Sequence, residues 1–216
     1  MIDDPTRFAN FCAAIAAMQY IPPYEVLKWY PYPDESDERL AELEEYIAER
    51  QGIPGFRIPP PMRSLYAVTG GWELSWVYNN PSPVNGRPPC GQSTLLSPVY
   101  VFTVGDDYGV GDEVPYDKDY RPFDTIDDTE EVALRFHRGV DEPELYWHDI
   151  AASVYHPLAL DVTSYIDLSM QCRVLYPWQQ FFITTPGFRI DEPTERAFFD
   201  NLARLFPDAD PARFRR

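Results

Sequence analysis

Cysteine is scarce in this sequence and does not occur in pairs. The three cysteines, Cys12, Cys90 and Cys172, are far apart, and no Cys-x-x-Cys motif is present. A disulfide framework needs an even set of cysteines, and a structural zinc site needs closely spaced ligands. The cysteines therefore argue against both, and they fit a protein of the reducing cytoplasm.

Long apolar runs are also lacking. No stretch approaches the roughly 20 apolar residues that a membrane-spanning helix needs. The first ten residues, MIDDPTRFAN, are acidic where a secretory signal peptide is basic. We therefore expect a cytoplasmic protein without a membrane partner.

Lysine is nearly absent, since Lys28 and Lys118 are the only two among 18 basic residues. These 18 are outnumbered by 35 acidic residues, which gives a formal net charge of −17. A nucleic-acid-binding protein usually carries a basic stripe, which this set does not supply, so we expect no nucleic-acid partner. Such an acidic field attracts basic partners at long range, although acidity also serves solubility alone.

The common catalytic motifs are missing. His137, His148 and His156 do not form a His-Glu-x-x-His motif, which favours hydrogen-bonded structural histidines over a zinc hydrolase. There is no Gly-x-Ser-x-Gly elbow and no phosphate-binding Gly-x-x-x-x-Gly-Lys loop. We therefore expect no catalytic residue and no cofactor. One alternative stays open, a cysteine-dependent hydrolase or transferase in which Cys90 acts with a histidine.

What the chain does contain is typical of a globular protein. Of its 216 residues, 44% are hydrophobic and 15% aromatic, enough to build a core. We find no internal repeat and no distinct linker. We therefore predict a single domain, 1–216, with N-terminal helices in 1–52, a sheet-containing core in 53–192, and a C-terminal helix and tail in 193–216.

Apolar periodicity predicts four longer helices. The first begins at Pro5 after Asp4 as its cap. The second, over 34–52, buries a face of Leu40, Leu43, Tyr46 and Ile47 and stops at Gly52. The third is capped by Asp161 and runs to about Leu175. The last covers 192–206, with Pro193 near its start and Phe198, Phe199, Leu202, Leu205 and Phe206 on its apolar face.

The central part of the chain predicts shorter elements. Residues 72–78, 99–104 and 145–150 read as strands because they are rich in β-branched and aromatic residues. Residues 129–136 favour a helix. Residues 79–98 read as a long loop rich in proline, glycine and asparagine, and 105–124 as a long hairpin or a surface loop.

The segment 105–124 is acidic and rich in tyrosine. Its carboxylates do not fit the ligand register of an EF-hand, so we expect no metal site. Tyrosines supply rigid contact area and carboxylates pair with arginine or lysine, a combination suited to binding a protein. The predicted contact residues are Asp106, Asp107, Tyr108, Asp112, Glu113, Tyr116, Asp117 and Asp119.

A second aromatic segment lies near the N-terminus. Its side chains, Tyr24, Trp29, Tyr30 and Tyr32, follow paired prolines. They form a second candidate binding face. The alternative, which we favour, is that they pack the first helix onto the rest of the domain.

The segment 57–78, RIPPPMRSLYAVTGGWELSWVY, resembles the hallmark of the SUKH superfamily, in which a short helix, a glycine turn and a strand follow one another. The matching positions are Pro59, Leu65, Tyr66, Gly70, Gly71, Trp72 and Trp76, and Trp178 matches a later Tyr-x-Trp-Gln segment. The resemblance implies an α+β fold, with a mixed or antiparallel sheet and helices packed mainly on one side.

The same resemblance bears on function. Many bacterial SUKH proteins are immunity proteins that bind and neutralise a toxin, and a fungal relative acts in cell-wall signalling. We therefore expect a non-catalytic protein that covers the active site of a cognate, basic toxin domain. A regulatory or scaffold protein without a toxin partner is the first alternative, and the cysteine-dependent hydrolase is the second.

Overall fold

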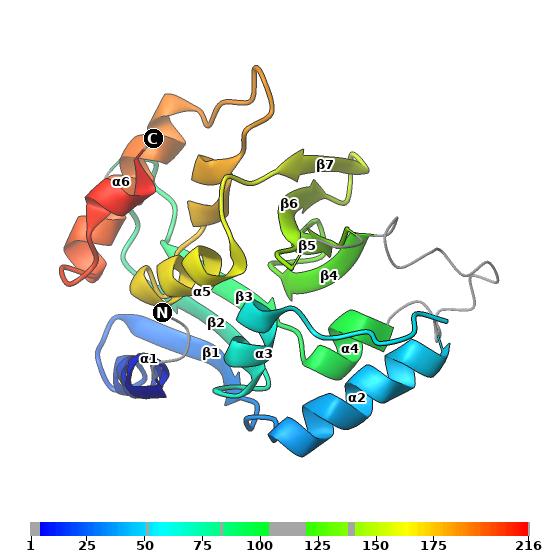
Figure 1. The fold of residues 1–216 in the computed structure, drawn as a ribbon. Helices are drawn as coiled ribbons and strands as arrows, with labels where there is room; N and C mark the ends of the chain where they lie inside the picture. The colour runs from blue at the N-terminus through cyan, green and yellow to red at the C-terminus, as the bar shows by residue number, and fades with distance from the viewer. Residues whose placement is uncertain (1–4, 51, 83, 104–119, 138–140, 216) are drawn as a thin grey trace.

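The computed structural model describes residues 5–50, 52–82, 84–103, 120–137 and 141–215. Seven strands form one sheet in the order β1-β2-β3-β4-β5-β6-β7, and every neighbouring pair is antiparallel (Figure 1). The strands are β1 (Tyr24–Pro31), β2 (Trp72–Tyr78), β3 (Cys90–Leu95), β4 (Tyr120–Thr125), β5 (Glu130–Arg135), β6 (Glu144–Asp149) and β7 (Val154–Pro157).

The described residues also contain six α-helices and two short 3-10 helices. The α-helices are α1 (Pro5–Met18), α2 (Asp37–Arg50), α3 (Pro60–Tyr66), α4 (Pro98–Thr103), α5 (Val162–Gln171) and α6 (Glu192–Leu205). The 3-10 helices are η1 (Trp178–Phe182) and η2 (Pro211–Phe214). No helix in the described ranges combines the length and the apolar character that crossing a membrane requires.

One face of the sheet is buried under the helices. Side chains alternate along β2, where Trp72, Leu74 and Trp76 are almost fully buried. Strand pairing continues this face through Leu95, Val132, Leu134, Leu145 and Trp147. The helices pack on it, directly or through one another (Figure 1). The α+β prediction, with helices on one side of the sheet, is thereby confirmed, and the sheet is antiparallel.

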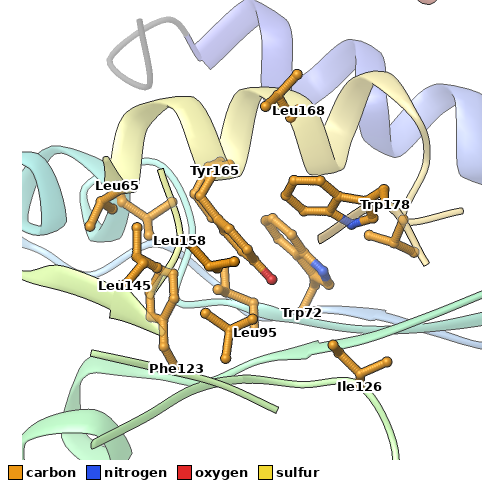
Figure 2. Packing of buried hydrophobic residues seen from close by; sticks show 14 of the residues in the cluster. Leu65, Trp72, Leu95, Phe123, Ile126, Leu145, Leu158, Tyr165, Leu168 and Trp178 are labelled. Atoms are coloured by element: carbon orange, nitrogen blue, oxygen red, sulfur yellow. The ribbon is translucent and has the colours of Figure 1, made fainter. Parts of the chain in front are cut away.

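Aromatic rings from α1 and α5 meet the sheet at the centre of the core. Phe11 of α1 lies 5.4 Å from the Trp72 ring. Tyr165 of α5 points from its helix toward the sheet, between Leu158 and Trp72, with Trp178 nearby (Figure 2). The Tyr165 and Trp178 ring centres are 4.8 Å apart. These large buried rings hold α1, α5 and η1 against β2.

Helix caps follow the sequence closely. The Asp161 carboxylate accepts a hydrogen bond from the Ser164 amide at 2.6 Å, as predicted for the start of α5. Asp191 does the same for Thr194 at the start of α6. The predicted extension of α5 to about Leu175 is wrong, because Arg173 and Val174 take positive φ angles and turn the chain.

Two short apolar segments take the opposite structure from the one predicted. Residues 99–104 were predicted as a strand, but 99–103, the part that the structure describes, belong to helix α4, whose last carbonyls at Val101 and Phe102 accept hydrogen bonds from buried Arg121. Residues 129–136, predicted as a helix, contain β5, which pairs with β4 on one side and β6 on the other. Tertiary pairing and capping decide such short runs, because periodicity cannot separate a buried strand from a buried helix over six residues.

The predicted long loop over 79–98 and the proline-rich segment near the N-terminus each contain a strand. Strand β3 forms from CGQSTL, although glycine and polar residues make it a weak strand by sequence. Strand β1 carries a bulge at Leu27, which breaks the alternation by which a strand is recognised. The structure therefore gives these segments sheet positions that their composition conceals.

Helix α2 differs from its predicted burial at two positions. Leu40 and Ile47 are buried as predicted, but Tyr46 is 48% exposed. Glu44 is buried instead, and its Oε1 accepts hydrogen bonds from the Ile58 amide at 3.0 Å and from Arg63 Nη1 at 2.8 Å. This carboxylate fastens the segment that leads into α3 onto α2, so a residue that reads as solvated has a structural role.

Candidate partner-binding face

The predicted acidic contact residues, Asp106 to Asp119, lie outside the described residues. The structure resumes at the next residue, Tyr120, which opens β4. Tyr120 belongs to the face of the sheet that the helices of the described residues leave uncovered. This face, over β4 to β7, contains a group of aromatic and charged side chains that the sequence did not single out.

Strand register defines this group. Tyr120 lies opposite Arg135, and Ala133 lies opposite Tyr146. His148 lies opposite Tyr155 on the last strand. These positions alternate with the buried Leu134, Leu145 and Trp147, so they point to the other side of the sheet. We call Tyr120, Arg135, Tyr146, His148 and Tyr155 the concave face.

The rings show that the sheet curls around this face. Tyr120 and Tyr155 are separated by three strand spacings and by four residue positions along the strands. A flat sheet would place them about 20 Å apart. Their ring centres are 3.8 Å apart and their planes are 12° from parallel. Strands β4 to β7 must therefore curve strongly toward one another, as the green part of the ribbon does (Figure 1).

The aromatic rings form a continuous stack. The His148 ring lies 3.8 Å from the Tyr155 ring, at 8° between planes, on the side opposite to Tyr120, because two rings cannot occupy one side at that distance. Tyr146 meets the edge of Tyr120 at 4.9 Å. Ala133, fully buried, lies beside Tyr146 in the register. A larger residue there would displace the rings, so the small side chain is needed for the stack.

Charged groups surround the stack and fix its members. Glu131 Oε1 lies 2.8 Å from His148 Nδ1. Glu144 Oε2 accepts a hydrogen bond from the Tyr146 hydroxyl at 2.8 Å and lies 3.0 Å from His137 Nε2. These bonds, from His137 first, hold the pKa of Glu144 below its usual value. The result is a preorganised aromatic surface with carboxyl groups at its rim.

Such a surface suits the recognition of a protein. Tyrosine supplies large, rigid contact area at a small cost in conformational entropy. All five members of the concave face are partly exposed, so another molecule can reach them. The carboxylates of Glu131 and Glu144 offer acceptors to arginine or lysine.

The second aromatic segment divides between packing and exposure. Trp29 meets Phe11 of α1 edge-on at 5.7 Å, and Tyr24 lies 6.0 Å from Trp76. For Trp29 the packing alternative is confirmed, because Phe11 belongs to α1, whereas the rings that pack against Tyr24 belong to β2 and to Phe206. Tyr30 is 56% exposed, and the Tyr32 hydroxyl donates to Glu73, a bond that raises the pKa of Tyr32 to about 12.

The residues of the SUKH-like segment lie in the core. Pro59 precedes α3, Gly70 and Gly71 join α3 to β2, and the remaining five are almost fully buried: Leu65, Tyr66, Trp72, Trp76 and Trp178. The Trp76 indole donates to the Arg173 carbonyl at 2.8 Å. These residues build the fold, which places any binding function on other surfaces.

The cysteines and histidines do not assemble in the described part of the chain. Cys172 is buried, Cys12 is half-buried and Cys90 is exposed on β3. Desolvation by neighbouring groups, followed by the charge of Asp127, raises the pKa of the Cys90 thiol, the opposite of an activated nucleophile. The three histidines bond to Glu144, Glu131 and Thr185, as hydrogen-bonded structural histidines do.

No group of three histidine, cysteine, aspartate or glutamate side chains among the described residues is placed to hold a metal ion. The Cys90 arrangement likewise gives no support to the hydrolase alternative. Comparisons of the chain with protein-family models, with curated proteins and with solved structures find no match. The SUKH resemblance therefore stays a prediction.

Replacing Cys90 with alanine is expected to leave stability and binding unchanged. The side chain is exposed on β3, and substitutions at such positions usually change stability by less than about 0.5 kcal/mol. Urea unfolding and the binding assay described below measure both quantities. A loss of the protein's biological activity, with folding and binding intact, would instead point to cysteine chemistry.

Sequence analysis missed the concave face for a definable reason. In LYWHD, the signal was present as alternation, with Leu145 and Trp147 on one side and Tyr146 and His148 on the other. The helix prediction over 129–136 hid the neighbouring strand and with it Arg135. A correct strand assignment there would have placed the aromatic residues on one face, although only the curled sheet brings Tyr120 to Tyr155.

Proposed function

We propose that this protein is a non-catalytic binding protein of the immunity type, which captures a basic toxin domain and covers its active site. The observation that carries the proposal is the concave face, a stacked aromatic surface with carboxylates at its rim and, among the described residues, no helix over it. The SUKH resemblance supports the choice of a toxin as the partner.

The charge of the chain favours a basic partner. A formal net charge of −17 attracts a positively charged protein over distances comparable to the Debye length and speeds encounter. Toxins that act on nucleic acids grip phosphates with arginine and lysine. Carboxylates placed over such residues neutralise the groups that the toxin needs for its substrate.

The concave face supplies the short-range part of binding in this proposal. Tyr155 has rings on both sides, and Tyr146 is held by Glu144, so their rotamers are already fixed. Less conformational entropy is lost on association when side chains are preorganised. The predicted acidic residues from Asp106 to Asp119 precede Tyr120 directly in the chain, and they remain proposed contacts.

Affinity purification from the native host tests the function. The tagged protein is expressed together with its neighbouring genes, and the proteins that elute with it are identified by mass spectrometry. A basic domain in equimolar amount, whose toxicity the protein suppresses, supports the proposal. A partnerless monomer under these conditions contradicts it and favours the regulatory alternative or the enzyme.

Replacing Tyr155 with alanine is expected to weaken binding of that partner by 10- to 100-fold. The substitution removes the central ring of the stack and frees Tyr120 and His148, which corresponds to about 1.5–3 kcal/mol at a binding hot spot. Surface plasmon resonance with the purified partner measures the dissociation constant.

The matched control is Tyr20, which is 83% exposed and follows α1 on another part of the molecule. Tyr20→Ala removes an identical side chain without touching the concave face, so binding should stay within about twofold. Equal losses in both variants, or none in Tyr155→Ala, would exclude the concave face as the contact surface. Circular dichroism verifies that both variants are folded.

A further inference from the structure

A groove of about 470 Å³ lies between the C-terminal helices and the segment that precedes them. None of its lining residues belongs to the concave face. Its walls come from η1, the chain from 183 to 190, α6 and η2, drawn in orange to red in Figure 1. Although polar groups form most of the accessible lining, six of the ten lining residues are apolar: Phe181, Ile183, Phe188, Ile190, Phe199 and Phe214. The volume is within the range of small-molecule sites.

The aromatic walls are held in place by contacts with other rings. Phe188 packs against Trp147 at 6.1 Å and against His156 at 5.4 Å. Phe199 packs against Phe181 at 5.3 Å. Because these contacts hold the rings in place, we expect the groove to keep its shape without a ligand.

Two arginines give the groove a charge opposite to that of the whole protein. Elsewhere in the described residues, arginines such as Arg63 and Arg173 form ion pairs with carboxylates. Within the same residues, Arg189 and Arg215 form none, although Glu195 also lines the groove. The Arg215 guanidinium lies 4.8 Å from the centre of the Phe199 ring, which orients it along the aromatic wall.

We infer that this groove binds a small aromatic carboxylate. A flat apolar ring would stack among the phenylalanines, and its carboxylate would reach the fork of Arg189 or Arg215, which matches carboxylate geometry. A cationic ligand is disfavoured by the two guanidinium groups. A neutral aromatic ligand would leave Arg189 and Arg215 without an ion pair. The inference does not depend on the proposed toxin binding, since the lining residues are separate from the concave face.

Titration with 2-naphthoate tests the inference, followed by backbone amide NMR of the isotope-labelled full chain. We expect saturable shift changes centred on residues 180–190, 195–199 and 212–215. The expected dissociation constant is about 0.1–1 mM, in line with a ligand of this size. The neutral analogue 2-naphthamide has the same ring system without the charge and should bind at least tenfold more weakly.

Arginine variants separate charge recognition from general stickiness. Arg189→Gln is expected to weaken 2-naphthoate binding by at least fivefold while leaving 2-naphthamide unaffected. Arg196→Gln is the matched control, because Arg196 is an exposed arginine on the neighbouring helix α6 and does not line the groove. Equal affinity for the two ligands, an unchanged affinity in Arg189→Gln, or shift changes outside the groove would each overturn the inference.

Discussion

Replacing Gly71 with alanine is expected to lower the free energy of unfolding by at least 3 kcal/mol, about 6–12 °C in melting temperature for a chain of this size. Gly71 joins α3 to β2 with a φ of +117°, a conformation that a residue with a Cβ rarely adopts. An added Cβ would also lie 2.2 Å from the Leu95 carbonyl oxygen, which is backbone and cannot turn away.

Hydrogen bonds leave Gly71 no room to relax. Its carbonyl accepts from the Tyr32 amide at 2.9 Å and from the Thr69 hydroxyl at 2.9 Å, and its amide donates to Thr69 Oγ1. A backbone shift that relieves the clash with Leu95 would break these bonds and the β2–β3 pairing beside Trp72. The strain therefore reaches the core rather than staying in a surface turn.

Gly187→Ala is the matched control for this prediction. Gly187 also has a positive φ, +86°, but an added Cβ there meets nothing within 4 Å. The Gly187→Ala variant therefore isolates the cost of the positive φ angle, a loss of about 1 kcal/mol in free energy of unfolding. Urea and thermal unfolding measure both variants. Similar losses in the two would show that close packing against Leu95 adds nothing and would contradict the prediction.

These glycines illustrate how much of the fold could be predicted. The helix, glycine pair and strand over residues 60–78 follow from local signals, namely prolines before a helix, glycines after it, and aromatic alternation in β2. Helix caps such as Asp161 are equally local. Close approach to Leu95 is not local, so the sequence indicated a turn at Gly71 without indicating why alanine is excluded there.

The segments that were predicted wrongly lack such local signals. Residues 99–104 carry apolar, β-branched residues that fit a buried strand, yet 99–103 form a helix that Arg121, almost 20 residues later, caps. Residues 129–136 have the opposite outcome because two neighbouring strands pair with them. In both cases a distant partner supplies the deciding hydrogen bonds.

The candidate site was harder to predict than the fold. Its residues are distributed over four strands, and their proximity arises from curvature rather than from spacing along the chain. A bulge between Pro122 and Asp124 contributes, because it places two consecutive side chains, Phe123 and Asp124, on the buried side of the sheet. The alternation before the bulge is thereby shifted by one residue, and Tyr120 lies on the opposite side. No sequence motif reports such a bulge.

The same bulge places the carboxyl group of Asp124 in the core, and we expect its titration there to make the stability of the fold depend on pH. Asp124 is fully buried and accepts hydrogen bonds from Ser93 Oγ at 2.7 Å and from the Tyr165 hydroxyl at 2.6 Å. Burial nevertheless dominates and raises the pKa of Asp124 to about 6. In the unfolded chain the pKa of an aspartate is about 3.9.

The sign of the pH effect follows from this difference. A pKa that is higher in the folded state means that folding favours the protonated carboxyl. Its stabilising effect is complete below about pH 4 and is lost as the pH rises through about 6. Asp124→Asn lacks this titration. Relative to the wild type, the variant should therefore gain about 2 kcal/mol in free energy of unfolding between pH 4 and pH 7.

Urea unfolding of both proteins across this pH range measures the difference, in which the titration of every other group cancels. Asparagine keeps an acceptor for Ser93, and the Tyr165 hydroxyl can rotate to accept from the new amide, so the variant is expected to fold. Asp128→Asn removes an exposed carboxylate of the same region and controls for the loss of one charge. A difference that stays flat with pH, or falls as the pH rises, would show that the hydrogen bonds from Ser93 and Tyr165 outweigh the burial of Asp124.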